Sequence, residues 1–310
     1  MREPRETYSE WPEFPPATWR DTYSTLHMWM QIVGKTRLAL APMENHWWQV
    51  ALYVTSRGLT TSPMPYGNFS FSVEFDFISH QLSARTSRGA EDSFALTSMT
   101  VAEFFARYLR SLRALAIEPT IIPSPVEVEV AIPFMHDHEH ASYDPVAAHR
   151  CWRIVAGAER VMKQFRGGFT GKQSPVHFFW GSFDLASTRF SGRRAPAHPG
   201  GVPNCPDRVM VEAYSHECSS CGFWPGDGVS RPPAFYAYSY PEPLGYPARS
   251  IEPSAAYYDV QAQEFLLPYE RLRTAAAPGD MLLRFFQSAY EAAADLAAWE
   301  RASLERPSAD

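Results

Sequence analysis

Histidine and acidic side chains gather in two segments of the C-terminal half of the chain. His177 and Asp184 belong to one aromatic segment, and His216 and Glu217 are neighbours further along. Imidazole and carboxyl groups within hydrogen-bonding reach of a substrate can take or give a proton. The sequence therefore predicts a general acid–base site made of these four residues.

The aromatic segment 176–185 has the composition of a β-strand. In a regular strand His177 and Asp184 would point to opposite faces, because successive side chains alternate. A β-bulge at Gly181 would bring both to one face. His216 and Glu217 also alternate, so one of them would face a cleft while the other stabilises the sheet.

Basic and aromatic residues near these groups are suited to holding a ligand. We expect Lys172, Arg189 and Arg193 to bind an anionic group, with Trp180 and Trp224 lining the site. Guanidinium groups match planar oxyanions in a bidentate manner. Two alternatives stay open: a structural ion pair between Asp184 and an arginine, and a desolvated lysine that acts as a base or a Schiff-base nucleophile.

Three histidines alternate in the segment His136-Asp-His-Glu-His140. In an extended chain His136, His138 and His140 project to the same side and could bind one divalent transition metal. His177 and His216 are further candidate ligands. The alternative is a solvated polar loop, and the sequence otherwise leaves the cofactor unknown.

The four cysteines are too few for a disulfide framework in a chain of 310 residues. Cys218 and Cys221 have the spacing of a redox pair or of half a zinc site, but no second pair of this spacing exists. We expect reduced thiols and leave the role of this pair open.

The composition is that of a folded globular protein, with 45% hydrophobic and 20% charged residues. A formal net charge of -6 disfavours binding to nucleic acid or to an anionic membrane surface. The apolar runs are far shorter than the ~20 residues that span a bilayer, and the N-terminus lacks a signal-peptide pattern. We therefore expect a cytoplasmic protein whose partner is a small molecule.

The hydrophobic periodicity predicts a mixture of helices and antiparallel strands. Thr100-Val-Ala-Glu103 is a capping box, and Asp144 before Pro145 is a second helix start. Further expected helices are 22–40 and a final one capped by Asp280, and the expected strands are 46–55, 71–77, 94–96, 126–130, 176–185, 235–240 and 264–267.

This order of elements predicts an α+β fold of two similar halves, each an antiparallel sheet covered by helices. The expected divisions are an extended arm at 1–20, a first half at 21–118, a proline-rich connection at 119–143 and a second half at 144–305, which carries the candidate site. Gly34-Lys35 and Gly171-Lys172 occupy similar places in the two halves, so an internal duplication is an open possibility.

Several aromatic-rich segments of the chain resemble sequence motifs of one bacterial protein family. They are Leu26-His-Met-Trp29 with Gly34-Lys35, His46-Trp-Trp48, Arg57-Gly-Leu-Thr-Thr-Ser-Pro63, His177-Phe-Phe-Trp-Gly-Ser-Phe-Asp-Leu185, Arg189-Phe-Ser-Gly-Arg193 and Gly222-Phe-Trp-Pro-Gly226. The family is known only as a domain of unknown function. The resemblance spans nearly the whole chain and implies one full-length unit, but no activity, cofactor or catalytic residue.

These observations favour an enzyme acting on a small polar or anionic metabolite in an aromatic cleft. Histidine and acidic groups would transfer protons, and arginines would bind the anion. The reaction class is open, with a hydrolase or lyase slightly favoured. The alternatives are a metal-dependent enzyme with a histidine-rich site and a non-catalytic protein that binds a small molecule.

Overall fold

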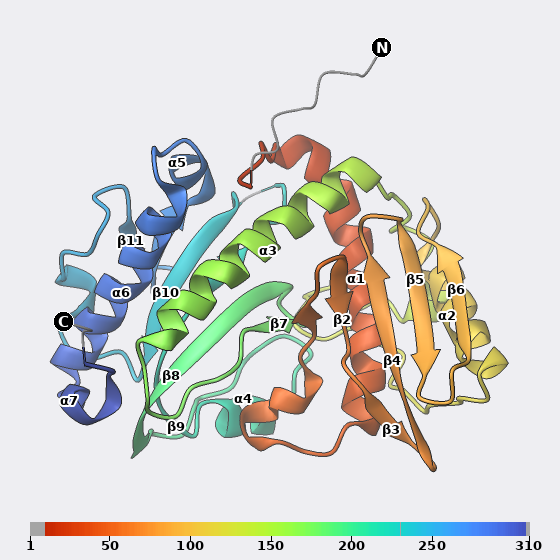
Figure 1. The fold of residues 1–310 in the computed structure, drawn as a ribbon, viewed down its shortest axis with the longest axis horizontal. Helices are drawn as coiled ribbons and strands as arrows, with labels where there is room; N and C mark the ends of the chain where they lie inside the picture. Colours follow the sequence, from red (N-terminus) through yellow and green to blue (C-terminus); the bar gives the residue numbers. More distant parts are fainter. Residues whose placement is uncertain (1–9, 230, 308–310) are drawn as a thin grey trace.

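The computed structural model describes residues 10–229 and 231–307. It contains two antiparallel sheets with helices packed against them, which confirms the predicted α+β class (Figure 1). The first sheet has the strand order β1-β2-β4-β5-β6, with β3 paired to β4. Its strands are β1 (Tyr53–Val54), β2 (Gly58–Thr60), β3 (Met64–Tyr66), β4 (Phe69–Asp76), β5 (Gln81–Thr86) and β6 (Glu91–Ala95).

The second sheet has the order β11-β12-β10-β9-β8-β7. Its strands are β7 (His177–Phe179), β8 (Asp184–Arg194), β9 (His216–Trp224), β10 (Ala234–Tyr240), β11 (Tyr257–Asp259) and β12 (Glu264–Pro268). Helices α3 (Pro145–Gly167) and α6 (Pro278–Leu296) pack on one face of this sheet (Figure 1). The opposite face holds the cleft described below.

Helix α1 (Pro16–Leu40) lies between the two sheets (Figure 1). It buries polar as well as apolar side chains, including Gln31 and Lys35. Leu52 and Phe178 form a bridge that joins the edges of the two sheets, with two backbone hydrogen bonds of 2.9 Å. One hydrophobic core runs through both halves. The internal duplication stays a prediction.

Helix α2 (Val101–Ala114) begins at the predicted capping box. The Thr100 side chain accepts from the backbone of Glu103, and the Glu103 carboxylate accepts from the backbone of Thr100. Its apolar stripe packs on the first sheet, where Phe104 stacks on Trp29 of α1 at 4.7 Å. Asp144 caps α3 as predicted.

Short helices complete the fold. They are η1 (Asn45–Val50), η2 (Phe134–His136), α4 (Asp207–Ala213), η3 (Tyr246–Ala248), α5 (Tyr269–Arg273) and α7 (Arg301–Leu304).

Several predicted elements are wrong. The strand expected at 46–55 is largely η1, because His46 and Trp47 adopt left-handed backbone angles, with φ of 59° and 60°. The strand expected at 126–130 is irregular chain. The segment 176–185 is a hairpin in which Gly181 lies in the turn between β7 and β8, so no bulge in a single strand is needed.

Two predicted helix boundaries also differ. The last residues of the expected arm, 16–20, belong to α1, and residues 1–9 lie outside the described part of the chain. Asp280 lies in the first turn of α6, whose N-cap is Ala277.

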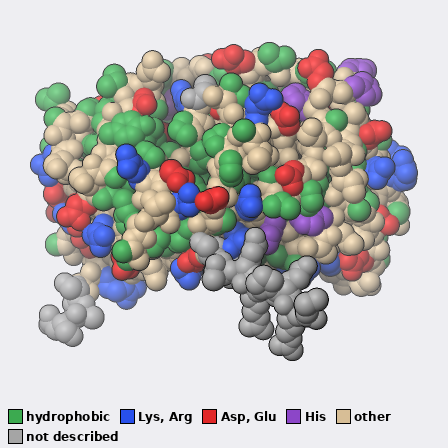
Figure 2. All heavy atoms as spheres, turned by 90° about the horizontal axis from the view of Figure 1, so that it is seen from above, with side chains coloured by type: hydrophobic (Ala, Val, Ile, Leu, Met, Phe, Trp, Pro, Cys, Tyr) green, Lys and Arg blue, Asp and Glu red, His purple; other side chains and the backbone are tan. Residues whose placement is uncertain are grey.

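No helix of the described residues is long and apolar enough to cross a membrane. Figure 2 shows acidic and basic side chains intermixed with hydrophobic ones over the face seen from above. That face therefore carries no broad patch of one charge sign.

Candidate functional site

A cleft of about 1090 Å³ opens on the face of the second sheet opposite to α3 and α6. Its floor comes from β8, β9, β10 and β12, and its walls come from β11 and from the loops around residues 127, 198, 232 and 262. This volume is slightly above the roughly 300–1,000 Å³ of ordinary small-molecule sites, so the cleft has room for a small ligand.

Tyrosine rings form the floor of the cleft. Tyr236, Tyr238 and Tyr240 alternate along β10, so all three side chains project from the same face of the sheet. The Tyr214 and Tyr238 hydroxyl groups are 2.7 Å apart, and the His198 ring stacks on Tyr214 with centroids 4.8 Å apart. The result is a broad aromatic surface that carries hydroxyl groups.

Asp184 begins β8 at the edge of this surface. Its carboxylate accepts hydrogen bonds from the Ser182 and Tyr236 hydroxyl groups. Burial raises the pKa of Asp184, whereas these two donors oppose the rise. Burial likewise raises the pKa of the Tyr236 hydroxyl, so Tyr236 stays a neutral donor.

Two further carboxyl groups flank Asp184. Within the described residues, neither the Glu127 nor the Glu264 carboxylate has a hydrogen-bond or ion-pair partner. Desolvation within the cleft, together with the charge of Asp184, raises the pKa of the half-buried Glu264 to about 7, whereas the Glu127 side chain is exposed. Glu264 can therefore donate or accept a proton near neutral pH.

The connection between the two halves holds Glu127 over the sheet. Its backbone N–H donates to Pro203 at 2.8 Å, and its φ is 59°. A Cβ atom on Gly181 would lie 2.1 Å from a Glu127 carboxylate oxygen, so any side chain at position 181 would displace this carboxylate.

The charge of the cleft is negative. Five acidic side chains line it, against one arginine, Arg231, among the described residues. His198 accepts a hydrogen bond from Gly200 at 3.0 Å through Nδ1, and burial lowers its pKa, so its ring is neutral near pH 7. The aromatic floor and the excess of carboxylates together suit a polar ligand without negative charge.

Two of the predicted site residues, Asp184 and Trp224, line this cleft. His177 lies on the neighbouring strand but is covered by Trp48 and Tyr53. Its ring is 1% exposed, and neither nitrogen has a partner within the described residues. Desolvation lowers the pKa of His177 to about 3.

His216 and Glu217 occupy other surroundings. The His216 ring lies 5.7 Å from the ring of His46. Glu217 points to the opposite face, where its carboxylate pairs with Arg193 at 2.7 Å. The structure therefore does not bring His177, Asp184, His216 and Glu217 together.

The predicted ligand-binding cations have other neighbours as well. The Arg189 guanidinium is buried on the helix-covered face between Phe165, at 3.4 Å, and Tyr290, at 4.3 Å, and burial lowers its pKa to about 10. Arg193 also binds the carbonyl groups of residues 297 and 298. Trp180 donates to Val50 at 2.8 Å inside the core.

The predicted metal-binding histidines do not form a ligand cluster. His140 pairs with Asp137 at 2.7 Å, whereas His136 and His138 are exposed. In the part of the chain that the structure describes, no group of three or more histidine, cysteine or acidic residues could hold a metal ion. Cys218 and Cys221 are free thiols in β9, and their spacing places them on opposite faces of the strand.

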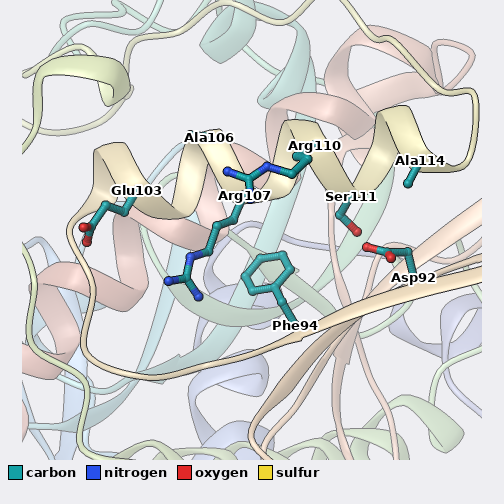
Figure 3. A pocket seen from close by; sticks show the side chains of 8 residues that line it. All are labelled: Asp92, Phe94, Glu103, Ala106, Arg107, Arg110, Ser111 and Ala114. Atoms are coloured by element: carbon teal, nitrogen blue, oxygen red, sulfur yellow. The ribbon is translucent and has the colours of Figure 1, made fainter.

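A second hollow of about 540 Å³ lies between β6 and α2. Figure 3 shows the side chains of Arg107 and Arg110 of α2 above and beside the Phe94 ring, with Asp92 near Ser111. Both arginines are exposed. This shallow groove has fewer converging polar groups than the cleft, so we take the cleft as the candidate functional site.

Sequence reasoning missed the tyrosines and two of the three central carboxyl groups. The alternation Tyr236-Ala-Tyr-Ser-Tyr240 was a visible signal, because tyrosines on one face of a strand mark a surface that is both apolar and hydrogen-bonding. Glu127 carried no such signal, because its position depends on how the proline-rich connection folds over the sheet.

The model of one protein family matches residues 11–306. The chain belongs to the family of unknown function DUF5996. This membership confirms the resemblance seen in the sequence and covers nearly the full length. No curated protein and no solved structure matches the chain.

Proposed function

We propose that the cleft binds a small polar molecule that carries a positive charge, such as a protonated or quaternary amine. The observation that carries this proposal is the convergence of the carboxyl groups of Glu127, Asp184 and Glu264 on a floor of tyrosine rings. This ligand class replaces the anionic metabolite expected from the sequence.

Charge compensation is the first argument. Glu264 is half-buried and lacks a partner among the described residues, and a partly desolvated carboxylate is costly unless a cation or hydrogen-bond donor compensates it. A ligand ammonium group would supply both. An anion would instead meet the same-sign field of the five acidic side chains.

The aromatic floor is the second argument. Tyr236 and Tyr238 lie 6.1 Å apart and nearly parallel, and Tyr240 meets Tyr214 edge to face at 5.1 Å. The negative face of a tyrosine ring attracts a cation, with a gain of about 0.5–2 kcal/mol per contact. Arg189 and Arg193, the cations expected to bind an anion, contact other groups outside the cleft. Neither of them offsets the negative charge of the cleft, which favours a cationic ligand.

Three probes of similar shape and different charge test the proposal: phenethylamine, phenethyl alcohol and phenylacetate. We expect calorimetry at pH 8 to give about tenfold tighter binding of the amine than of the alcohol, with phenylacetate weakest. Glu264→Gln should weaken the preference for the amine, whereas the matched variant Glu118→Gln, an exposed change outside the cleft, should keep it. Equal affinities for the three probes would refute the proposal.

Proton transfer within the cleft is a second candidate function, which would make the protein an enzyme. A carboxyl group whose pKa is raised to about 7, as for Glu264, in a cleft that also holds a neutral tyrosine donor is suited to general acid–base catalysis. Incubation of the bound amine in heavy water, followed by NMR, tests this candidate. Hydrogen exchange or conversion that is lost in Glu264→Gln supports an enzyme, and an unchanged ligand supports a binding protein.

We also propose that the protein works in the cytoplasm. The support is that all four cysteines are free, and that the pair with redox spacing is buried on two faces of one strand.

A further inference from the structure

Lys172 and His46 meet outside the cleft in a contact that the proposed function does not use. The Lys172 amine lies 2.7 Å from Nε2 of His46. Lys172 lies beside β8, and its carbonyl oxygen accepts a hydrogen bond from the backbone N–H of Phe190 at 3.0 Å. The lysine backbone is thereby fixed, and its amine is directed at the imidazole.

The imidazole of His46 has a defined tautomer in this contact. Its Nδ1 lies 2.9 Å from the carbonyl oxygen of Ala213, at the end of α4, so Nδ1 carries the proton and donates it. Nε2 therefore keeps its lone pair toward Lys172. His46 is 4% exposed and has the left-handed backbone conformation, with its ring 5.3 Å from that of Trp48.

The surroundings of the amine are poor in negative charge. Its Nζ lies 5.1 Å from the Phe190 ring and 5.5 Å from the Trp48 ring. Within the described residues no carboxylate forms an ion pair with it, whereas the amine of Lys163 pairs with Glu159 at 2.5 Å. Desolvation lowers the pKa of Lys172, and burial lowers that of His46.

The charged groups around this pair come from several elements. Glu212 of α4 accepts from the His46 backbone N–H at 3.3 Å and is the acidic group that acts on Lys172. His216 of β9 packs on His46, and Arg194 of β8 pairs in register with His216. One carboxylate thus faces a lysine, an arginine and two histidines.

We propose that Lys172 is a nucleophilic amine, with His46 as its proton acceptor, that forms an imine with a small aldehyde. The ammonium gives a proton to Nε2 of His46, and the free amine attacks the carbonyl carbon to form a carbinolamine. His46 returns the proton to the carbinolamine hydroxyl, which leaves as water while the nitrogen becomes a protonated imine. The site is exposed at Lys172, so an aldehyde has access.

Reductive labelling tests this inference, because the chain has only three lysines. The folded protein is treated with trace propionaldehyde and cyanoborohydride at pH 7, and mass spectrometry gives the labelling rate of each lysine. Lys163, exposed and ion-paired, is the internal control. We expect Lys172 to react severalfold faster than Lys163, because the imidazole of His46 accepts a proton from its amine, whereas the amine of Lys163 is held in an ion pair.

Two further measurements separate the roles of the pair. The rate for Lys172 should reach half its maximum at lower pH than the rate for Lys163, and His46→Gln should bring the two rates together. If that variant does not fold, the pH profiles of the unmodified chain decide. A Lys172 rate no higher than that of Lys163, or preferential labelling of the buried Lys35, would overturn the inference.

Discussion

Asp184 and His177 show how neighbouring strands give ionisable residues opposite roles. They lie on adjacent strands and on the same face of the sheet. Asp184 opens to the cleft and receives two hydroxyl donors, which stabilise its charged form. His177 is covered by aromatic rings of the first half and has no partner for either nitrogen within the described residues. The carboxylate can meet a ligand, whereas the imidazole behaves as part of the core.

His177→Phe should therefore stabilise the protein, most strongly in acid. The unfolded histidine takes up a proton below its ordinary pKa of 6.5, whereas the folded one stays neutral down to about 3. Its lowered pKa makes stability fall as pH drops through 6.5. The loss between pH 7 and pH 5 is about 2 kcal/mol. Removing two unpaired buried nitrogens adds roughly 1 kcal/mol at pH 7.

Urea unfolding of both proteins at pH 5 and pH 7 measures these differences. His138→Phe is the control, because His138 is exposed and its replacement should leave the pH dependence of unfolding unchanged. A His177→Phe variant that loses as much stability on acidification as the unmodified chain would show that another group is responsible.

Helix α1 is the element that depends most on a close contact between the two halves. A Cβ atom on Gly34 would lie 2.3 Å from atoms of the Trp180 indole, which is fixed by its hydrogen bond to Val50. Alanine normally stabilises a helix interior relative to glycine by about 0.5–1 kcal/mol. Here the clash should outweigh that gain, because a fixed indole cannot move aside.

We expect Gly34→Ala to lower the free energy of unfolding by about 2 kcal/mol. Gly167→Ala in α3 is the matched control, since a Cβ there has no atom within 4 Å. Its effect should be neutral or stabilising. Equal effects of the two changes in urea unfolding would mean that the contact between α1 and Trp180 is not tight.

Elements with local signals were predictable from the sequence. The capping box at Thr100 and the Asp144-Pro145 helix start depend on side chains that bond to their own backbone, so their residues alone reveal them. Helix η1 had no such signal. His46 is held in its left-handed conformation by Ala213 and Glu212, which lie far away in the sequence.

The candidate site was predictable only in part, because its side chains also depend on residues far away in the sequence. Asp184 stood out as an acid among aromatic residues. The hairpin turn lies within a continuous aromatic segment and has no sequence signal of its own. The hydrogen bond between Asp184 and Tyr236 of β10 therefore could not be predicted from the spacing of residues along the chain. Arg189 appeared available for an anion, but aromatic rings of α3 and α6 enclose it.

At the scale of the whole molecule, the buried histidines and the half-buried Glu264 change the stability of the fold in opposite directions as pH rises. His27 and His177 have lowered pKa values of about 4 and 3, so the folded state gains stability as pH rises toward 6.5. Glu264 has a raised pKa of about 7. Between pH 4.5 and 7 the folded state holds more protons at this carboxyl group than the unfolded state, so its contribution to stability falls as pH rises.

The variant Glu264→Gln tests how much this carboxyl group contributes to the pH dependence of stability. The amide stays neutral at every pH and resembles the protonated acid, so the melting temperature of the variant relative to the unmodified chain should rise by a few degrees from pH 5 to pH 8. Glu118→Gln, an exposed change outside the cleft, should show a constant difference. A constant or falling difference for Glu264→Gln would show that the cleft already compensates this carboxylate. A cationic ligand would then have no unpaired charge to recognise there, so this measurement on the unliganded protein also bears directly on what the cleft binds.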